Sequence, residues 1–178
     1  GSTGASSSEV LEYVGIPTLA AIQEALDGLA EIDGSGQIPI VLMGGIKDGV
    51  DVAKALALGA NATAVGTAAI IAGGCISCMQ CHVGTCVVGI ATQDPEHEKR
   101  YNVPAEALHI HHFLENVRWQ LASIVDGLGY TDFRQLGRDD LVALTPEAAE
   151  ITQLPYAPEY SREPKPFAQF KTLLTERF

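Results

Sequence analysis

The chain has 178 residues and a formal net charge of −11, from 11 Lys and Arg against 22 Asp and Glu, and 47% of its residues are hydrophobic. A chain of this length forms one ordinary domain with a hydrophobic core, or part of a larger domain. The excess of acidic residues argues against a nucleic-acid partner, because binding to phosphates depends on clustered Lys and Arg.

The start of the chain resembles no targeting segment. Residues 1–8 are small and polar, which on its own indicates a flexible leader. No basic segment followed by an apolar stretch opens the chain, so we expect a cytoplasmic protein. Residues 55–80 carry no charge and are long enough to cross a membrane. Because Gly59, Gly66 and Gly73 interrupt them, together with polar residues, we expect no membrane helix there.

Two helices and a strand are predicted in the first 45 residues. Apolar residues recur at helical spacing over residues 9–30, on either side of Pro17, so the second helix should begin near Pro17 or Thr18. Residues 38–43 are then almost entirely aliphatic and end at Gly44. A continuous apolar run that ends in glycine is typical of a strand buried on both faces, as in parallel sheets.

A strand–helix–strand unit continues from there. Asp48 is suited to cap a helix over residues 49–58, which Gly59 should close. Residues 62–65 form a second short apolar run, and another helix is expected to start at Ala68. Short links between alternating strands and helices predict a parallel sheet.

The last third of the chain is predicted to be helical. A helix should begin at Pro104, run to Leu128 with one apolar face and end at Gly129. A shorter helix is expected over residues 132–143, and the Pro-bearing tail, residues 146–178, should wrap a surface. Two parallel strands cannot close a barrel, so a longer chain or other subunits must supply the rest of the fold.

All four cysteines lie within twelve residues, at Cys75, Cys78, Cys81 and Cys86. Disulfides suit small secreted domains, and four-thiolate zinc sites are commonly built from two Cys-x2-Cys pairs far apart, so both are weaker interpretations. An iron–sulfur cluster needs three or four thiolates that converge on one compact group, which successive short spacings provide. His82 is then better interpreted as a hydrogen-bonding neighbour of the cluster than as a ligand.

Glycine-rich turns follow both predicted strands. Gly44 and Gly45 end the first strand, and Gly66 and Thr67 end the second. Ligands of α/β proteins bind at the carboxyl edge of the sheet, where backbone amides without a neighbouring Cβ let phosphate oxygens approach. The two turns are therefore a candidate phosphate site, although tight turns need glycine regardless.

Six segments resemble the FMN-binding domain of the glutamate synthase family, and the Cys-His-x3-Cys run with the closely following GIATQ is the most specific. They are GSTGA at 1–5, MGGIKD at 43–48, KALALGA at 54–60, VGTAA at 65–69, GCISCMQCHVGTC at 74–86 and GIATQ at 89–93. A looser match continues through VR at 117–118, Gly129 and GRDDL at 137–141, so the resemblance covers about four-fifths of the chain.

The resemblance implies an α/β fold, the C-terminal part of a (β/α)8 TIM barrel with an iron–sulfur loop and C-terminal helices. The implied divisions are the following: 1–72, the loop after the sixth strand with the last two strands of the FMN-binding barrel; 73–100, the iron–sulfur cluster loop; 101–145, the C-terminal helices; and 146–178, the tail.

The same resemblance implies which residues bind FMN. The family's phosphate-binding positions correspond to Gly44, Gly45, Gly66 and Thr67. The segment with Gly1, Ser2 and Thr3 corresponds to a Gly-Gly-Thr-Gly-Ala loop near the flavin, in which Ser2 replaces the second glycine. The resemblance therefore indicates that these residues form a flavin-binding loop and not a flexible leader.

The cluster type stays open. Large synthases of the family resemble this chain at Cys75, Cys81 and Cys86 and carry a 3Fe–4S cluster. The fourth cysteine, Cys78, resembles archaeal-type synthases and stand-alone glutamate-synthase-like subunits, such as the one in N-methylglutamate synthase or dehydrogenase. Four thiolates suit a 4Fe–4S cluster.

The implied activity is that of an FMN- and iron–sulfur-dependent amino-acid oxidoreductase. The cluster would pass single electrons to FMN, which would deliver a hydride to an imine of 2-oxoglutarate with ammonia or methylamine, giving glutamate or N-methylglutamate, or run the reverse oxidation. Implied partners are the N-terminal remainder of the barrel and glutaminase-like and flavin- or NAD(P)H-linked subunits in a hetero-oligomer. The alternative is an electron-transfer or structural metal-binding subunit whose active site lies on another chain.

No residue stands out as a general acid or base. Asp48, Asp51 and Asp94 are better interpreted as helix caps or solvated charges. His109 and His112 lie on one face of the long predicted helix, where a solvated or partner-facing patch is favoured over a metal pair.

Overall fold

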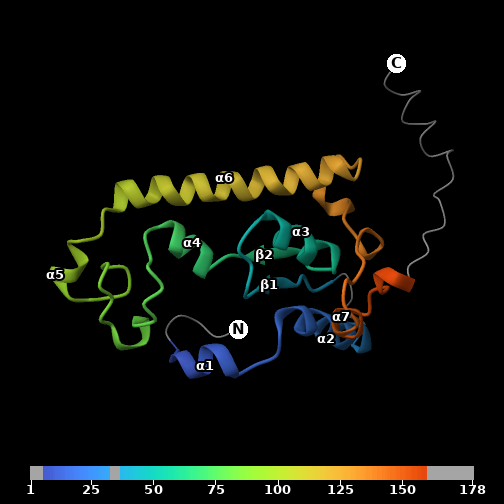
Figure 1. The fold of residues 1–178 in the computed structure, drawn as a ribbon, viewed down its shortest axis with the longest axis horizontal. Coiled ribbons are helices and arrows are strands. Elements are labelled where there is room, and N and C mark those ends of the chain that lie inside the picture. Colours follow the sequence, from blue (N-terminus) through green and yellow to red (C-terminus); the bar gives the residue numbers. More distant parts are fainter. Residues whose placement is uncertain (1–5, 33–36, 160–178) are drawn as a thin grey trace, which may run out of the picture.

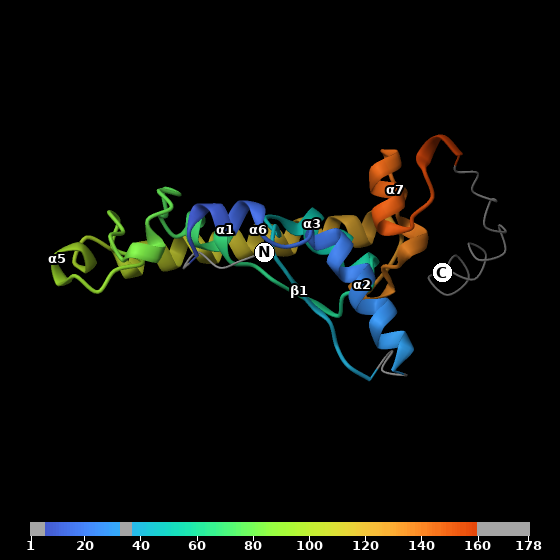
Figure 2. The same cartoon turned by 90° about the horizontal axis from the view of Figure 1, so that it is seen from below.

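The computed structural model describes residues 6–32 and 37–159. It is elongated, with the long helix α6 (Val103–Gly127) along one side and the two short strands and α3 (Gly49–Ala57) beside it (Figure 1). The view from below, in Figure 2, shows α2 (Thr18–Glu31) and α7 (Pro146–Thr152) at the same end of the molecule.

Two helices precede the sheet, as the sequence predicted. α1 spans Ser8–Tyr13, and α2 begins at Thr18, directly after Pro17. A proline here costs the helix nothing, because the N–H groups of the first turn have no partner within the helix. α2 presents Ile22 to the core, where its side chain is 2% exposed.

The parallel pair of strands is confirmed. β1 (Val41–Met43) pairs with β2 (Ala62–Ala64), with Val41 opposite Ala62 and Met43 opposite Ala64. The expectation that the first strand is buried on both faces is wrong for the described residues. Leu42 is buried, but Val41 and Met43 are 58% and 62% exposed. Successive side chains point to opposite faces, and helices cover only one of them.

α3 connects the two strands and is capped as predicted. The Asp48 side chain accepts a hydrogen bond from the Asp51 backbone N–H at 2.9 Å. Gly59 ends the unit at a φ of +113°, a conformation that favours glycine. One core cluster lies between the helices and the sheet, and its buried members are Ile22, Leu42, Ala55, Leu58 and Ala60.

The long C-terminal helix is also confirmed. α6 carries Pro104 in its first turn, and the Asn102 side chain accepts a hydrogen bond from the Ala105 N–H at 3.3 Å. It packs against α3 and against α4 (Thr67–Ala72), which starts one residue before the predicted Ala68. A second core cluster joins it to α3, with buried residues Ala53, Ala57, Val125 and Leu136.

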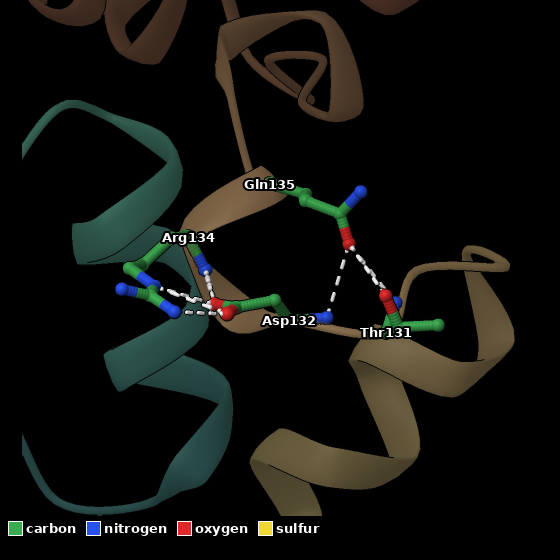
Figure 3. A network of polar contacts seen from close by, with 4 residues as sticks. All are labelled: Thr131, Asp132, Arg134 and Gln135. Carbon is green, nitrogen blue, oxygen red and sulfur yellow. Dashed lines mark hydrogen bonds and ion pairs between the residues drawn. The ribbon is translucent and has the colours of Figure 1, made fainter.

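The helix predicted over residues 132–143 is wrong. Two three-residue 3-10 helices occupy the region, η2 (Phe133–Gln135) and η3 (Arg138–Asp140). Figure 3 shows the capped start of the first turn: Asp132 binds Arg134, and the Gln135 side chain accepts hydrogen bonds from Thr131 and from the Asp132 N–H. The turn ends because the backbone is extended at Leu136, with a ψ of 134°, and Gly137 then precedes the second 3-10 helix.

The tail is partly helical. α7 spans Pro146–Thr152 and packs against α2, and Ala143 and Tyr156 form a parallel β-bridge. A final 3-10 helix, η4, covers Ala157–Glu159. Thus the described part of the tail does lie against another element, as predicted.

No helix within the described ranges is both long and apolar enough to cross a membrane. The uncharged segment 55–80 forms the end of α3, β2, α4 and part of the cysteine segment.

Candidate functional site

The two predicted glycine turns leave the sheet at the same edge. The parallel register places Met43 beside Ala64, so the turns that follow them lie next to each other. Gly44 and Gly45 adopt φ values of +116° and +71°, which favour glycine. A Cβ added at Gly45 or Gly66 would meet no heavy atom within 4 Å. Backbone at both turns is thus open to a ligand.

A cavity of about 410 Å³ adjoins only the first of these turns. Gly44 and Gly45 line it together with residues of α3, α7 and the start of α2, and most of its lining is apolar. Gly66 and Thr67 are not part of the lining. The structure therefore brings the two turns to one edge without enclosing them in one cavity.

Charged side chains at this cavity are paired with each other. Lys47 Nζ lies 2.7 Å from Asp51 Oδ2, and Lys54 Nζ lies 3.6 Å from Asp51 Oδ1. Partial burial of Asp51 opposes its ionisation, but hydrogen bonds from the Lys47 side chain and N–H outweigh it and lower the pKa of this carboxyl group. Asp51 is held as an anion by structural neighbours, as expected for a residue without an acid–base role.

The cysteine segment joins α4 to α5 (Pro95–Glu98) and includes the 3-10 helix η1 (Cys81–Val83). It lies beyond the N-terminal end of α6 in Figure 1. Five of its residues have positive φ and turn the chain back repeatedly; they are Gly74, Ser77, Met79, Gly84 and Gly89. None of the four cysteines is in a disulfide.

Cys86 has the most specific environment of the four. Its side chain is 3% exposed, and the backbone N–H groups of four following residues act on its sulfur; they are Val88, Gly89, Ile90 and Ala91. Burial alone would raise the pKa of this thiol, but the four N–H groups outweigh burial and lower it. Thiolate is the form that binds metals, so Cys86 is prepared for ligation.

The other three cysteines are half-buried, and Cys75 Sγ accepts a hydrogen bond from the Ser77 N–H at 3.4 Å. Over the described residues no three His, Cys, Asp or Glu side chains come close enough together to hold a metal ion. The sequence prediction of an iron–sulfur cluster would draw its thiolates from this tightly turned segment.

Of the remaining sequence-predicted residues, Asp94 and His109 have side-chain partners, and His82 and His112 are exposed. Asp94 caps α5 by accepting a hydrogen bond from the Glu96 N–H at 2.9 Å, as predicted. His109 Nδ1 lies 2.9 Å from Glu106 Oε2, and His112 is exposed beside His111. His82 is exposed within η1. Both His109 and His112 fit the interpretation as a solvated patch.

Gly1, Ser2 and Thr3 lie outside the described residues, so their assignment to the flavin stays a prediction. Sequence reasoning missed one residue at the site, Tyr101, which hydrogen-bonds to Gly73 just before the cysteines. Its only sequence signal is a tyrosine next to the capped start of the long helix, which carries no information about a partner 28 residues away.

Comparison with known proteins identifies the family to which the chain belongs. Residues 1–131 match the profile described as "Conserved region in glutamate synthase". The chain is 36% identical over 173 residues to a glutamate synthase large subunit-like protein of Rhizobium meliloti, a match that covers 88% of this chain and 39% of the relative.

Two further relatives agree. The chain is 39% identical to the archaeal-type glutamate synthase (NADPH) of Thermotoga neapolitana, over 76% of this chain and 27% of the relative. It is 38% identical to glutamate synthase (NADH) of Schizosaccharomyces pombe, over 79% of this chain and 7% of the relative. The chain therefore spans less than two-fifths of the length of these curated relatives. With nearly three-quarters of its residues inside the matched region, the chain belongs to the family defined by the conserved region in glutamate synthase.

Proposed function

We propose that the chain is part of a glutamate synthase-type oxidoreductase that uses FMN and an iron–sulfur cluster. Its substrates would be 2-oxoglutarate with ammonia or methylamine, and its products glutamate or N-methylglutamate, in either direction. The observation that carries the proposal is that one family match, residues 1–131, includes both glycine turns and all four cysteines.

The glycine turns are proposed to hold the FMN phosphate. The open space around Gly45 and Gly66 leaves their backbone N–H groups accessible, and Thr67 adds a hydroxyl group at the start of α4. Bound FMN supplies hydride chemistry; the chain's part is to bind and orient it. The charged side chains nearby, Lys47 and Asp51, neutralise each other and take no proton in this scheme.

The cysteine segment is proposed to hold the cluster through Cys75, Cys81 and Cys86, with Cys78 as a fourth ligand in the 4Fe–4S case. An iron–sulfur cluster supplies one-electron chemistry. The N–H groups around Cys86 lower the pKa of its thiol, and hydrogen bonds to cluster sulfurs tune the reduction potential.

The rest of a TIM barrel is proposed to cover the open face of the sheet. Val41 and Met43 expose large apolar side chains on that face, and a parallel sheet is stable when both faces are covered. The short share of each relative that the chain spans supports a larger protein or assembly. The relatives' names include NADPH and NADH, which supports an NAD(P)H-linked partner, with a glutaminase-like subunit in the hetero-oligomer.

Anaerobic purification of the full-length protein tests the proposal. We expect flavin absorbance at about 450 nm together with iron and acid-labile sulfide. Iron without FMN would favour the alternative, an electron-transfer or structural metal-binding subunit. Zinc as the sole metal would contradict an iron–sulfur cluster under either function.

A further inference from the structure

One side chain contacts both ends of the cysteine segment. The Tyr101 hydroxyl group donates a hydrogen bond to the carbonyl oxygen of Gly73, at 3.0 Å, two residues before Cys75. The Cβ of the same tyrosine lies 3.3 Å from the point where a side chain at Gly89 would begin, three residues after Cys86. Tyr101 therefore lies between the point where the segment leaves the core and the point where it returns.

Both glycines are buried and have no room for a side chain. A Cβ at Gly73 would lie 2.8 Å from Ile110 Cδ1 and 3.2 Å from the Tyr101 hydroxyl oxygen. A Cβ at Gly89 would overlap the backbone carbonyl oxygen of His97, and its φ of +88° also favours glycine. The backbone at each end is thus fixed by close contact with the region around Tyr101.

The far end of the segment also lies close to the buried Cys86 sulfur. The backbone N–H of Gly89 is one of four that act on this sulfur. The residue that Tyr101 supports is therefore part of the environment of a proposed ligand. At the near end, a Cβ added at Gly74 would lie 3.1 Å from the Glu106 carboxylate, so α6 contacts this end as well.

We propose that Tyr101 is a positioning residue for the metal-binding segment, holding Gly73 and Gly89 in place so that the cysteines between them are arranged before the cluster binds. The inference rests on the proposed iron–sulfur function. Bringing together the ends of a long loop lowers the entropy of the chain. A contact that fixes both ends in advance therefore makes the free energy of cluster binding more favourable.

The test compares Tyr101→Phe with a matched control, Tyr130→Phe. Each change removes one phenolic oxygen; the Tyr130 hydroxyl group binds Asp140 Oδ1 at 2.8 Å, outside the cysteine segment. In the anaerobically purified full-length protein we expect Tyr101→Phe to lose iron to a chelator about fivefold faster than the wild type, the effect of one ordinary hydrogen bond. We also expect a lower midpoint potential, because a looser near end weakens the hydrogen bond from the Ser77 N–H to Cys75 Sγ, and such bonds stabilise the reduced cluster.

A second measurement does not depend on iron. In metal-free protein, amide hydrogen exchange at Gly74 and Cys75, whose N–H groups donate to carbonyl oxygens of α4, should be faster in Tyr101→Phe, with exchange in α3 unchanged. Tyr130→Phe should resemble the wild type in iron loss, potential and exchange at these residues.

The proposal is overturned if Tyr101→Phe matches the wild type in iron loss and in exchange, or if both tyrosine variants change alike. Absence of iron from the wild type contradicts the proposed function instead, and the exchange comparison then still decides the role of Tyr101.

Discussion

The backbone N–H of Gly49 donates a hydrogen bond to the side-chain oxygen of Gln120, at 2.8 Å, and so joins the first residue of α3 to the middle of α6. The helices cross so closely that a Cβ at residue 49 would lie 2.7 Å from Gln120 Cβ and 2.9 Å from the Leu121 backbone nitrogen. This crossing holds the strand–helix–strand unit against the helix that follows the cysteine segment.

Gly49→Ala is expected to lower the free energy of unfolding by about 1–3 kcal/mol, because the new methyl group overlaps backbone atoms that cannot rotate away. Urea unfolding of the purified protein measures the change. Gly28→Ala is the matched control: residue 28 lies within α2 with no heavy atom near its Cβ position, so the change should be neutral or stabilising. Equal destabilisation by both variants would mean that the close crossing is not the cause.

Hydrogen bonds from the Arg138 side chain connect the end of α7 with α2. Its guanidinium group donates to Gln23 Oε1 and to the Gln153 carbonyl oxygen, both at 3.0 Å, and also to the Thr152 carbonyl oxygen. Arg138→Lys keeps the charge but cannot make this fork, so we expect a loss of about 1–3 kcal/mol in urea unfolding. Arg118→Lys, on the exposed face of α6, should leave the unfolding midpoint unchanged.

Asp132 provides a test by titration. The hydrogen bond from the Arg134 side chain, followed by that from the Arg134 backbone N–H, lowers the pKa of Asp132 from 3.8 to about 2 (Figure 3). A depressed carboxyl pKa stabilises the folded state above the unfolded value, so this contribution is lost as the pH falls from about 4 through about 2. In Arg134→Ala, the Asp132 carboxyl resonance should titrate nearer pH 4 by NMR; an unchanged midpoint would contradict the assigned cause.

Gly66→Val tests the proposed phosphate site. Space around residue 66 is open, so the valine side chain should meet no neighbouring residue while it fills the place of the phosphate oxygens. We expect weaker FMN retention during gel filtration. Gly137→Val is the control, since residue 137 is equally open but lies between η2 and η3. Flavin retention equal to that of the wild type would place the phosphate elsewhere.

Local signals account for the parts of the fold that the sequence predicted. The Asp48 cap, the prolines before α2 and in α6, and the short apolar runs each act over a few residues, and the elements they specify formed where expected. The prediction that β1 is buried on both faces was wrong, because burial of the second face needs another layer of structure. No such layer is present among the described residues. Tyr101 could not be predicted, because its partner in the chain, Gly73, is brought to it by the packing of α4 on α6.

Substitution of single cysteines tests whether three or four thiolates bind the proposed cluster. Replacing Cys81 by Ser should abolish iron binding, because every proposed cluster type uses this thiolate. Cys78→Ser should keep most of the iron and the paramagnetic signal of a three-iron cluster if three thiolates suffice. Iron analysis and electron paramagnetic resonance of the two anaerobic variants measure this difference. Equal and complete loss of iron in both would contradict the three-thiolate cluster and leave the four-thiolate one, since Cys78 would then be as necessary as Cys81.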